Sequence, residues 1–85
     1  MTIELVFLAR LRERFGVSRE AFELNVGIRT VSDLLAALRE RGGAFADELA
    51  EGRTFRVAVN QDVVALDHPV QDGDEVAIFP PVTGG

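Results

Sequence analysis

The last seven residues of the chain have types and an order that could carry chemistry. They read Phe79-Pro80-Pro81-Val82-Thr83-Gly84-Gly85, an apolar strand end followed by two prolines and a terminal glycine pair. Proline fixes the backbone φ angle and favours an extended path, whereas glycine has no Cβ and passes through a channel too narrow for side chains. Extended, the segment from Pro80 onward reaches about 20 Å. The pattern predicts a stiff tail that carries the Gly85 carboxylate into another protein.

The α-carboxylate of Gly85 is the reactive group that such a tail delivers. It is ionised at neutral pH, and a carboxylate is a poor acyl donor until it is activated. Attack on a nucleoside triphosphate gives an acyl-adenylate, which a sulfur, nitrogen or oxygen nucleophile can open. A terminal Gly-Gly is a weak signal by itself, and the alternative is a frayed end without a role. The apolar strand end and the two prolines before it favour acyl-transfer chemistry at Gly85.

Composition limits what else the chain can do. Its 85 residues predict one domain with little surface for a private catalytic cleft. It contains no cysteine, which excludes disulfides, thiol nucleophiles and thiolate metal sites. Any sulfur that it handles must therefore sit on the C-terminus. The net charge of −5 disfavours nucleic acid as a partner and suits a basic protein surface.

The hydrophobic residues are not arranged for a membrane. No run approaches eighteen apolar residues, and no basic segment followed by an apolar one opens the chain. We therefore expect neither a membrane span nor a secretory signal. The expected location is the cytoplasm.

The periodicity of the remaining sequence predicts an α+β fold. The expected elements are, in order, a strand at 2–8, a helix at 9–15, a strand at 21–26, a long helix from 31, a short helix at 45–49, and strands at 55–60, 63–65 and 75–79. Thr30 and Asp33 have the spacing of a capping box, and Gly42-Gly43 is expected to end the long helix at C′. One dominant amphipathic helix among short strands predicts a mixed sheet with that helix packed on one face.

Some apolar residues fall on the face that this arrangement leaves open. In the strands 2–8 and 75–79, alternation places Leu8 and Phe79 on the faces that glutamates mark as exposed. A few buried apolar anchors usually carry most of the energy of a protein interface. The predicted docking residues are Phe79, Leu8, Val63 and Arg12.

The single histidine and the acidic turns do not predict a catalytic or metal site. His68 precedes a proline in a turn and has no nucleophile to serve, so a structural role is expected. Asp67, Asp72, Asp74 and Glu75 lack the spacing of a calcium loop. Turn formation accounts for Asp67 and for Asp72-Gly73, and no metal is expected.

The order of elements resembles the β-grasp, or ubiquitin-like, fold. Residues 58–85 closely resemble the small subunit of molybdopterin synthase (the MoaD family) in the runs Ala58–Gln61, Asp67–Val70, Asp72–Val76 and Phe79–Gly85. Residues 1–57 match that family in pattern, and the segment 42–56 departs most from it. The resemblance divides the chain into a β-grasp domain at 1–79 and a projecting tail at 80–85.

What the resemblance implies is a sulfur carrier. Gly85 would be adenylated by an ATP-dependent enzyme related to ubiquitin activators (MoeB-like), and a sulfur donor would convert the adenylate to a thiocarboxylate. The tail would then enter the large synthase subunit (MoaE-like), where its sulfur passes to cyclic pyranopterin monophosphate. Pro80 and Pro81 would set its direction, Val82 and Thr83 would contact the partner, and Gly84 would give passage.

The same resemblance implies that the chain binds no cofactor of its own. ATP would be used by the activating enzyme, and the catalytic side chains would lie on the large subunit. The family also suggests a heterotetramer of two small and two large subunits.

Three other functions fit the sequence. The first is a related Gly-Gly sulfur carrier that serves thiazole synthesis or tRNA thiolation. The second is a ubiquitin-like modifier joined through Gly85 to lysines of other proteins. The third is a passive ubiquitin-like binding module, which would need no free Gly-Gly.

Overall fold

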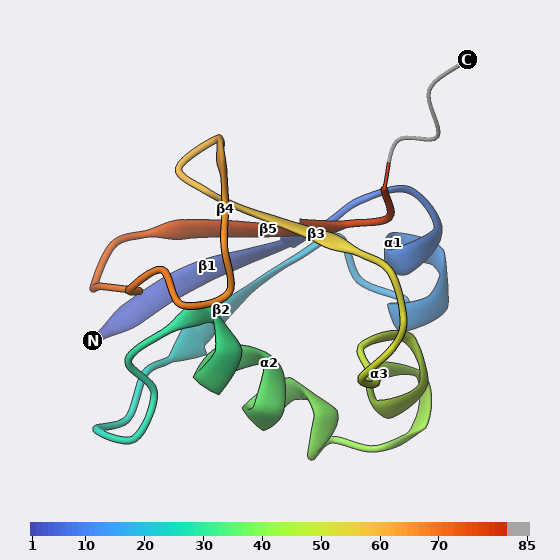
Figure 1. Ribbon diagram of the computed structural model, residues 1–85, viewed down its shortest axis with the longest axis horizontal. Coiled ribbons are helices and arrows are strands. Elements are labelled where there is room, and N and C mark those ends of the chain that lie inside the picture. Colours follow the sequence, from blue (N-terminus) through green and yellow to red (C-terminus); the bar gives the residue numbers. More distant parts are fainter. Residues whose placement is uncertain (82–85) are drawn as a thin grey trace.

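The computed structural model describes residues 1–81, which form one mixed β-sheet with helices on one side. The strands are β1 (Thr2–Phe7), β2 (Arg19–Glu23), β3 (Arg56–Val59), β4 (Asp62–Val64) and β5 (Glu75–Phe79). The helices are α1 (Ala9–Phe15), α2 (Val31–Arg39) and α3 (Gly43–Glu48). The strand order is β2-β1-β5-β3-β4, with β1 and β5 parallel at the centre and the other neighbours antiparallel. This confirms the predicted α+β class, and Figure 1 shows the sheet nearly edge-on above α2 and α3.

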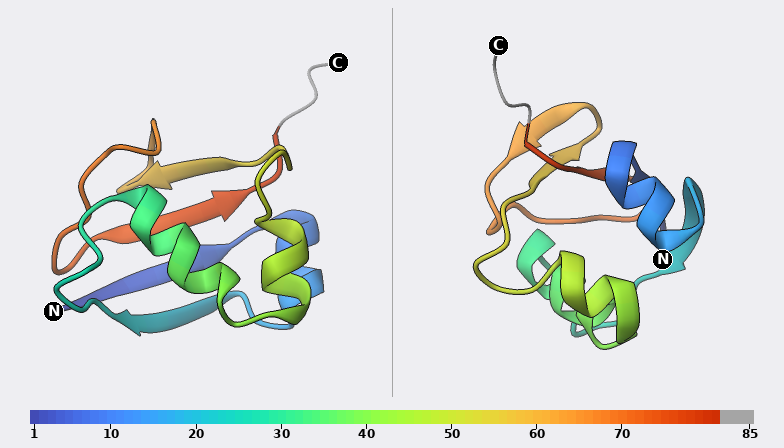
Figure 2. Two further views of the ribbon diagram at one scale, coloured as in Figure 1. Left: turned by 60° about the horizontal axis from the view of Figure 1, so that its bottom comes forward. Right: turned by 90° about the vertical axis from the view of Figure 1, so that its right-hand side faces the viewer.

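Helix α2 begins at the predicted capping box and covers one face of the sheet (Figure 2). The Thr30 side chain accepts a hydrogen bond from the Asp33 N–H, and the Asp33 carboxylate accepts one from the Thr30 N–H. The helix then buries one apolar stripe, consisting of Val31, Leu34, Leu35 and Leu38. Against this stripe lie the inward side chains of the strands, among them Ile3, Leu5, Phe7, Val57, Val76 and Ile78.

The second strand is shorter than predicted at its C-terminal end. It ends at Glu23 rather than at residue 26, because Asn25 forms a turn in which its Oδ1 accepts a hydrogen bond from the Gly27 N–H at 2.9 Å. Leu24 still packs into the core, whereas Val26 is almost fully exposed at the turn. The strand therefore ends at an asparagine whose side chain accepts from the backbone N–H two residues later.

The expected role of Gly42-Gly43 at the end of α2 is wrong. The helix ends earlier, with Glu40 as its C-cap in a right-handed conformation. Gly42 has a φ of 76° and is the N-cap of α3, whose first residue is Gly43. The glycine pair therefore makes the bend between two helices, a position where positive φ favours glycine.

The acidic turn before β5 fastens the two ends of the sheet together. The Thr2 N–H donates to Asp72 Oδ1 at 2.7 Å, and Asp74 accepts hydrogen bonds from the Gln71 N–H and the Asn60 side chain. Asp72 and Asp74 thus have structural hydrogen bonds at this turn, and the turn role expected for the Asp67 side chain stays a prediction. The backbone of His68 likewise holds α2, since its carbonyl accepts from the Val31 N–H at 2.9 Å.

Within residues 1–81, no helix is both long enough and apolar enough to cross a bilayer. In the same range, no three acidic or histidine side chains gather closely enough to hold a metal ion.

Candidate functional site

The face of the sheet opposite α2, here called the open face, carries a strip of small apolar residues. The strand registers place Val6 opposite Ala77, Ala77 opposite Ala58, and Ala58 opposite Val63. Directly opposed residues on neighbouring strands project to the same side of a sheet. The strip therefore runs across four strands, from β1 to β4, and ends at Val63, which is 64% exposed.

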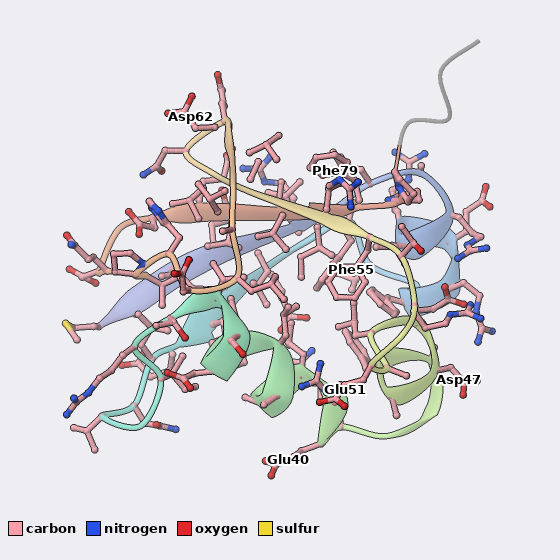
Figure 3. The ribbon with its side chains drawn as sticks, in the orientation of Figure 1. Glu40, Asp47, Glu51, Phe55, Asp62 and Phe79 are labelled. Carbon is pink, nitrogen blue, oxygen red and sulfur yellow. The ribbon has the colours of Figure 1, made fainter. Side chains whose placement is uncertain are left out.

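A second row lies beside this strip, at the end of the sheet from which the C-terminal segment leaves. Phe79 is paired with Arg56 on β3, and the Leu8 N–H donates to the carbonyl next to Phe79, that of Ile78, at 3.2 Å. Figure 3 shows Phe79 on the side of the sheet away from the helices and Phe55 on the helical side. Leu8 is 41% exposed and Phe79 is half-buried.

An ion-pair cluster bounds the open face at its other end. Arg19 on β2 donates hydrogen bonds to Glu4 on β1 and to Glu75 on β5, the second at 3.0 Å. The hydrogen bond from Arg19 lowers the pKa of the Glu4 carboxyl, so this end is charged at neutral pH. The apolar strip thus has a polar border on one side and Phe79 with Leu8 on the other.

The structure brings together most of the predicted docking residues. Phe79 and Val63 lie on the open face, Leu8 lies beside Phe79 at the start of α1, and Arg12 is exposed on α1. Val63 and Phe79 are not direct neighbours, because β3 lies between their strands. Their role in docking remains a prediction.

Sequence reasoning missed the residues between these anchors, namely Arg56, Ala58 and Ala77. Alternation in β3 marks Arg56 and Ala58 as sharing one face, so the signal was present in the sequence. The sequence pattern did not give the register between β3 and β5, which sets Arg56 opposite Phe79.

The tail begins at Pro80 and Pro81, which are half-buried beside a shallow hollow. That hollow is also lined by Arg10, Arg53 and Thr54. The predicted tail residues Val82, Thr83, Gly84 and Gly85 lie outside the described part of the chain. The structure therefore gives the position from which the tail leaves, at the end of the central strand β5 (Figure 1).

A buried carboxylate organises the region around Pro80 and Pro81. Glu48, only 6% exposed, accepts hydrogen bonds from Arg10 at 2.8 Å, Arg14 at 3.0 Å and Arg53 at 3.4 Å. Desolvation by itself raises the pKa of the Glu48 carboxyl, but the hydrogen bond from Arg14 and the charges of Arg10 and Arg53 outweigh it and hold the pKa below its ordinary value. This cluster joins α1, α3 and the segment before β3 next to the tail.

Comparison with curated proteins finds relatives over the full length of the chain. The chain is 42% identical over 83 residues to the molybdopterin synthase sulfur carrier subunit of Escherichia coli (strain K12), covering 98% of this chain and 99% of that protein. It is 34% identical over 93 residues to small archaeal modifier protein 3 of Haloferax volcanii, covering all of both chains.

Solved structures agree with these relatives. SAMP1 from Haloferax volcanii superposes with a TM-score of 0.78 at 31% identity, over the whole of both chains. Subunits 1 and 2 of the molybdopterin-converting factor from Helicobacter pylori 26695 have been solved as a complex, and a chain of that structure matches with a TM-score of 0.69 at 26% identity over the whole of both chains. These neighbours confirm the ubiquitin-like β-grasp fold.

The model of the ThiS family matches residues 5–85, which is nearly the entire chain. The chain is also 42% identical to a sulfur carrier subunit over 98% of its length. Sequence and fold therefore assign the protein to the same family. The chain belongs to the ThiS family of ubiquitin-like sulfur carriers, together with the sulfur carrier subunits of molybdopterin synthase.

Proposed function

We propose that this chain is the sulfur-donating small subunit of a molybdopterin synthase. The observation that carries the proposal is the 42% identity to the Escherichia coli sulfur carrier subunit over 98% of this chain, which extends the resemblance of the run Phe79–Gly85 to the whole sequence. As such a subunit, the chain takes part in a sulfurtransferase reaction, and the catalytic side chains belong to the large subunit.

The chemistry proceeds at Gly85 in two stages. An oxygen of its carboxylate attacks the α-phosphate of ATP and displaces pyrophosphate, which gives an acyl-adenylate. A sulfur donor then replaces AMP and leaves a thiocarboxylate. In the synthase, this sulfur is transferred to cyclic pyranopterin monophosphate, and two such transfers build the dithiolene of molybdopterin.

The position of the tail suits a carrier that visits two enclosed sites in turn. Strand β5 is the middle strand of the sheet and is paired on both sides, so Phe79 is a fixed point. Pro80 and Pro81 follow directly and restrict the backbone. Holding a reactive group on a defined mount reduces the entropy lost when it reaches its acceptor. Val82 and Thr83 are proposed to contact the partner inside its channel, and Gly84 to give passage.

The docking surface proposed for both partners is centred on Phe79, with Leu8, Val63 and Arg12. These partners are a MoeB-like activating enzyme, which uses the ATP, and a MoaE-like large subunit. The solved complex of the two Helicobacter pylori subunits supports a partner of the second kind. A sulfur donor is the third proposed partner, and neither nucleic acid nor a membrane is a partner. We propose that the reaction takes place in the cytoplasm and that the small and large subunits form a heterotetramer.

A second candidate function is protein modification through Gly85. It is favoured by the 34% identity to small archaeal modifier protein 3 over the whole of both chains. In that reaction a lysine amine of a target protein opens the acyl-adenylate, and an amide forms in place of the thiocarboxylate.

Reconstitution with the large subunit tests the proposed function. The chain carrying the thiocarboxylate is mixed with the purified large subunit and cyclic pyranopterin monophosphate, and molybdopterin is measured against the amount of chain consumed. We expect two chains to be consumed for each molybdopterin formed, and no product from a Gly85 deletion. If the chain instead forms amides with lysines in lysate and yields no molybdopterin, the modifier function is the correct one.

A further inference from the structure

The charge of this protein is unevenly distributed along the molecule. The segments 9–16 and 47–56, which surround the start of the tail, hold five of the nine arginines and four of the fourteen carboxylates. The rest of the chain holds four arginines and ten carboxylates. The overall charge of −5 therefore comes from the rest of the molecule, and the end that bears the tail is slightly positive.

Two arginines at this end are fixed beside the prolines of the tail. Arg10 and Arg53 line the hollow next to Pro80 and Pro81 and share Glu48 as an acceptor. About half of each arginine side chain remains exposed to solvent. The buried carboxylate thus holds them in place without covering them, so their orientation is set before a partner arrives.

A third arginine borders the open face. Arg56 lies opposite Phe79, is exposed, and donates through Nη1 to the neighbouring carbonyl of Phe55 at 3.3 Å. The acidic side chains Asp47 and Glu51 point to the helical side of the molecule, away from the start of the tail (Figure 3). Arg10, Arg53 and Arg56 therefore lie closer to the start of the tail than Asp47 and Glu51 do.

We infer that Arg10, Arg53 and Arg56 form a basic rim that docks against carboxylates around the mouth of the channel that receives the tail. This inference rests on the proposed function, because it assumes that a partner takes up the tail. The net charge of −5 favours a basic partner surface. At the rim, by contrast, the inference requires an acidic partner surface. An acidic channel mouth attracts the rim and repels the rest of the chain, so encounters in which the tail leads are favoured.

The occupant of the rim is protein and not the nucleotide. Four residues separate Pro81 from the C-terminal carboxylate, and extended through a channel they span about 13 Å. The reacting phosphate of ATP lies at that carboxylate, which is farther from the rim than an arginine side chain extends. The groups that the rim meets are those at the channel entrance.

Charge reversal at two matched positions tests the rim. Arg56→Glu alters the rim, whereas Arg29→Glu makes the same change in net charge at an exposed position outside it. Association with the purified large synthase subunit of the same organism is followed by stopped-flow at low and high salt. We expect Arg56→Glu to lower the association rate constant about tenfold at low salt and far less at high salt, since salt screens exposed charges. Arg29→Glu should change it less than about twofold.

The absence of lysine from this chain allows a direct mapping of the contact. All nine basic residues are arginine, so Arg56→Lys introduces the only side-chain amine. A carbodiimide joins an amine to a carboxylate with which it is in contact. We expect the Arg56→Lys protein to become linked, through position 56, to an Asp or Glu of the large subunit, and the Arg29→Lys protein to give no link through position 29.

Two results would overturn the rim. The first is equal effects of Arg56→Glu and Arg29→Glu on association while wild-type chain binds and transfers sulfur, which leaves the proposed function intact. The second is a shift of the Arg10, Arg53 and Arg56 side-chain NMR signals on addition of ATP alone, which makes the rim a nucleotide site. If wild-type chain neither binds the large subunit nor yields molybdopterin, the proposed function fails and the rim fails with it.

Discussion

On the helical face of the sheet, Phe7, Val76 and Ile78 are completely buried against the helices, whereas on the open face Leu8 and Val63 leave much of their apolar surface in solvent. Phe7 and Leu8 are adjacent in the chain, and exposed Val63 is likewise adjacent to Val64, which packs against the core. Burial of apolar surface contributes about 25 cal/mol per Å², so the helical face supplies most of the free energy of folding. The exposed residues gain little of this energy within the single chain.

Residues that stabilise the fold and residues available for binding are thus adjacent along the same strand. Ile78 faces the core and Phe79 faces away from it. Apolar side chains left exposed together on one face of a small protein commonly mark an interaction site. We therefore expect substitutions on the helical face to affect the free energy of unfolding, and substitutions of the exposed residues on the open face, such as Leu8 and Val63, to affect the affinity for partners.

The largest effect is expected on the helical face. Ile78→Ala removes a fully buried side chain from the central strand and should lower the free energy of unfolding by about 2–5 kcal/mol. Urea unfolding followed by circular dichroism measures it. The folded fraction should bind the large subunit with unchanged affinity, and a loss of less than about 1 kcal/mol would show that the helical face does not carry the core.

On the open face, Phe79→Asp should act on binding. We expect the affinity for the large subunit to fall about a hundredfold, as for a central apolar anchor, while the unfolding midpoint in urea changes little. The matched control is Val26→Asp, at an almost fully exposed valine in the turn after β2. It should change neither the affinity for the large subunit nor the unfolding midpoint. Unfolding of the Phe79→Asp protein would mean that Phe79 belongs to the core.

A smaller effect that depends on pH is expected at the tail-bearing end. The pKa of the Glu48 carboxyl is held below its ordinary value in the folded chain, so its ionised form stabilises the fold above the unfolded pKa of about 4.3. This stabilisation is lost as the pH falls through the folded pKa. Glu48→Gln should cost about 1–2 kcal/mol at pH 7 and less as the pH falls below 4. Glu40→Gln, at an exposed glutamate (Figure 3), is the control.

A cost for Glu48→Gln that stays constant between pH 7 and pH 3 would contradict this account. It would mean that the carboxylate charge adds nothing to the hydrogen bonds that Arg10, Arg14 and Arg53 donate.

The smallest effects are expected from two adjacent valines of β4, which lie on opposite faces of the sheet. Val64 packs against the core, whereas Val63 is exposed on the open face. Val64→Ala should lower the free energy of unfolding by about 1 kcal/mol, and Val63→Ala should lower it less while weakening binding to the large subunit two- to fivefold, about 0.5–1 kcal/mol. Identical behaviour of the two variants in both assays would remove the distinction between the faces.

The parts of the fold that depend on neighbours in sequence were predictable. The capping box of Thr30 and Asp33 joins residues three apart, and the alternation that exposes Leu8 continues directly from β1. The end of β2 was not predicted, because the propensity of residues 24–26 for a strand was weighed without the turn that Asn25 forms through its own side chain.

The arrangement around the tail could not be read from the sequence. Glu48 receives its hydrogen bonds from Arg10 and Arg14, which are 38 and 34 residues away. Likewise, the opposition of Arg56 and Phe79 depends on the register between β3 and β5. Such contacts are set by tertiary packing, and periodicity carries no information about them.

The proposed function requires that Gly85 carry sulfur, and the intact mass of the untagged chain measures whether it does. The chain is incubated with ATP, the activating enzyme and a sulfur source, and replacement of one carboxylate oxygen by sulfur should add about 16 Da, nearly the same as oxidation of Met1. The Gly85 deletion is therefore measured in parallel. We expect the gain in the full chain and no gain in the deletion. An equal gain in both proteins, or no gain in either, would contradict the proposed function.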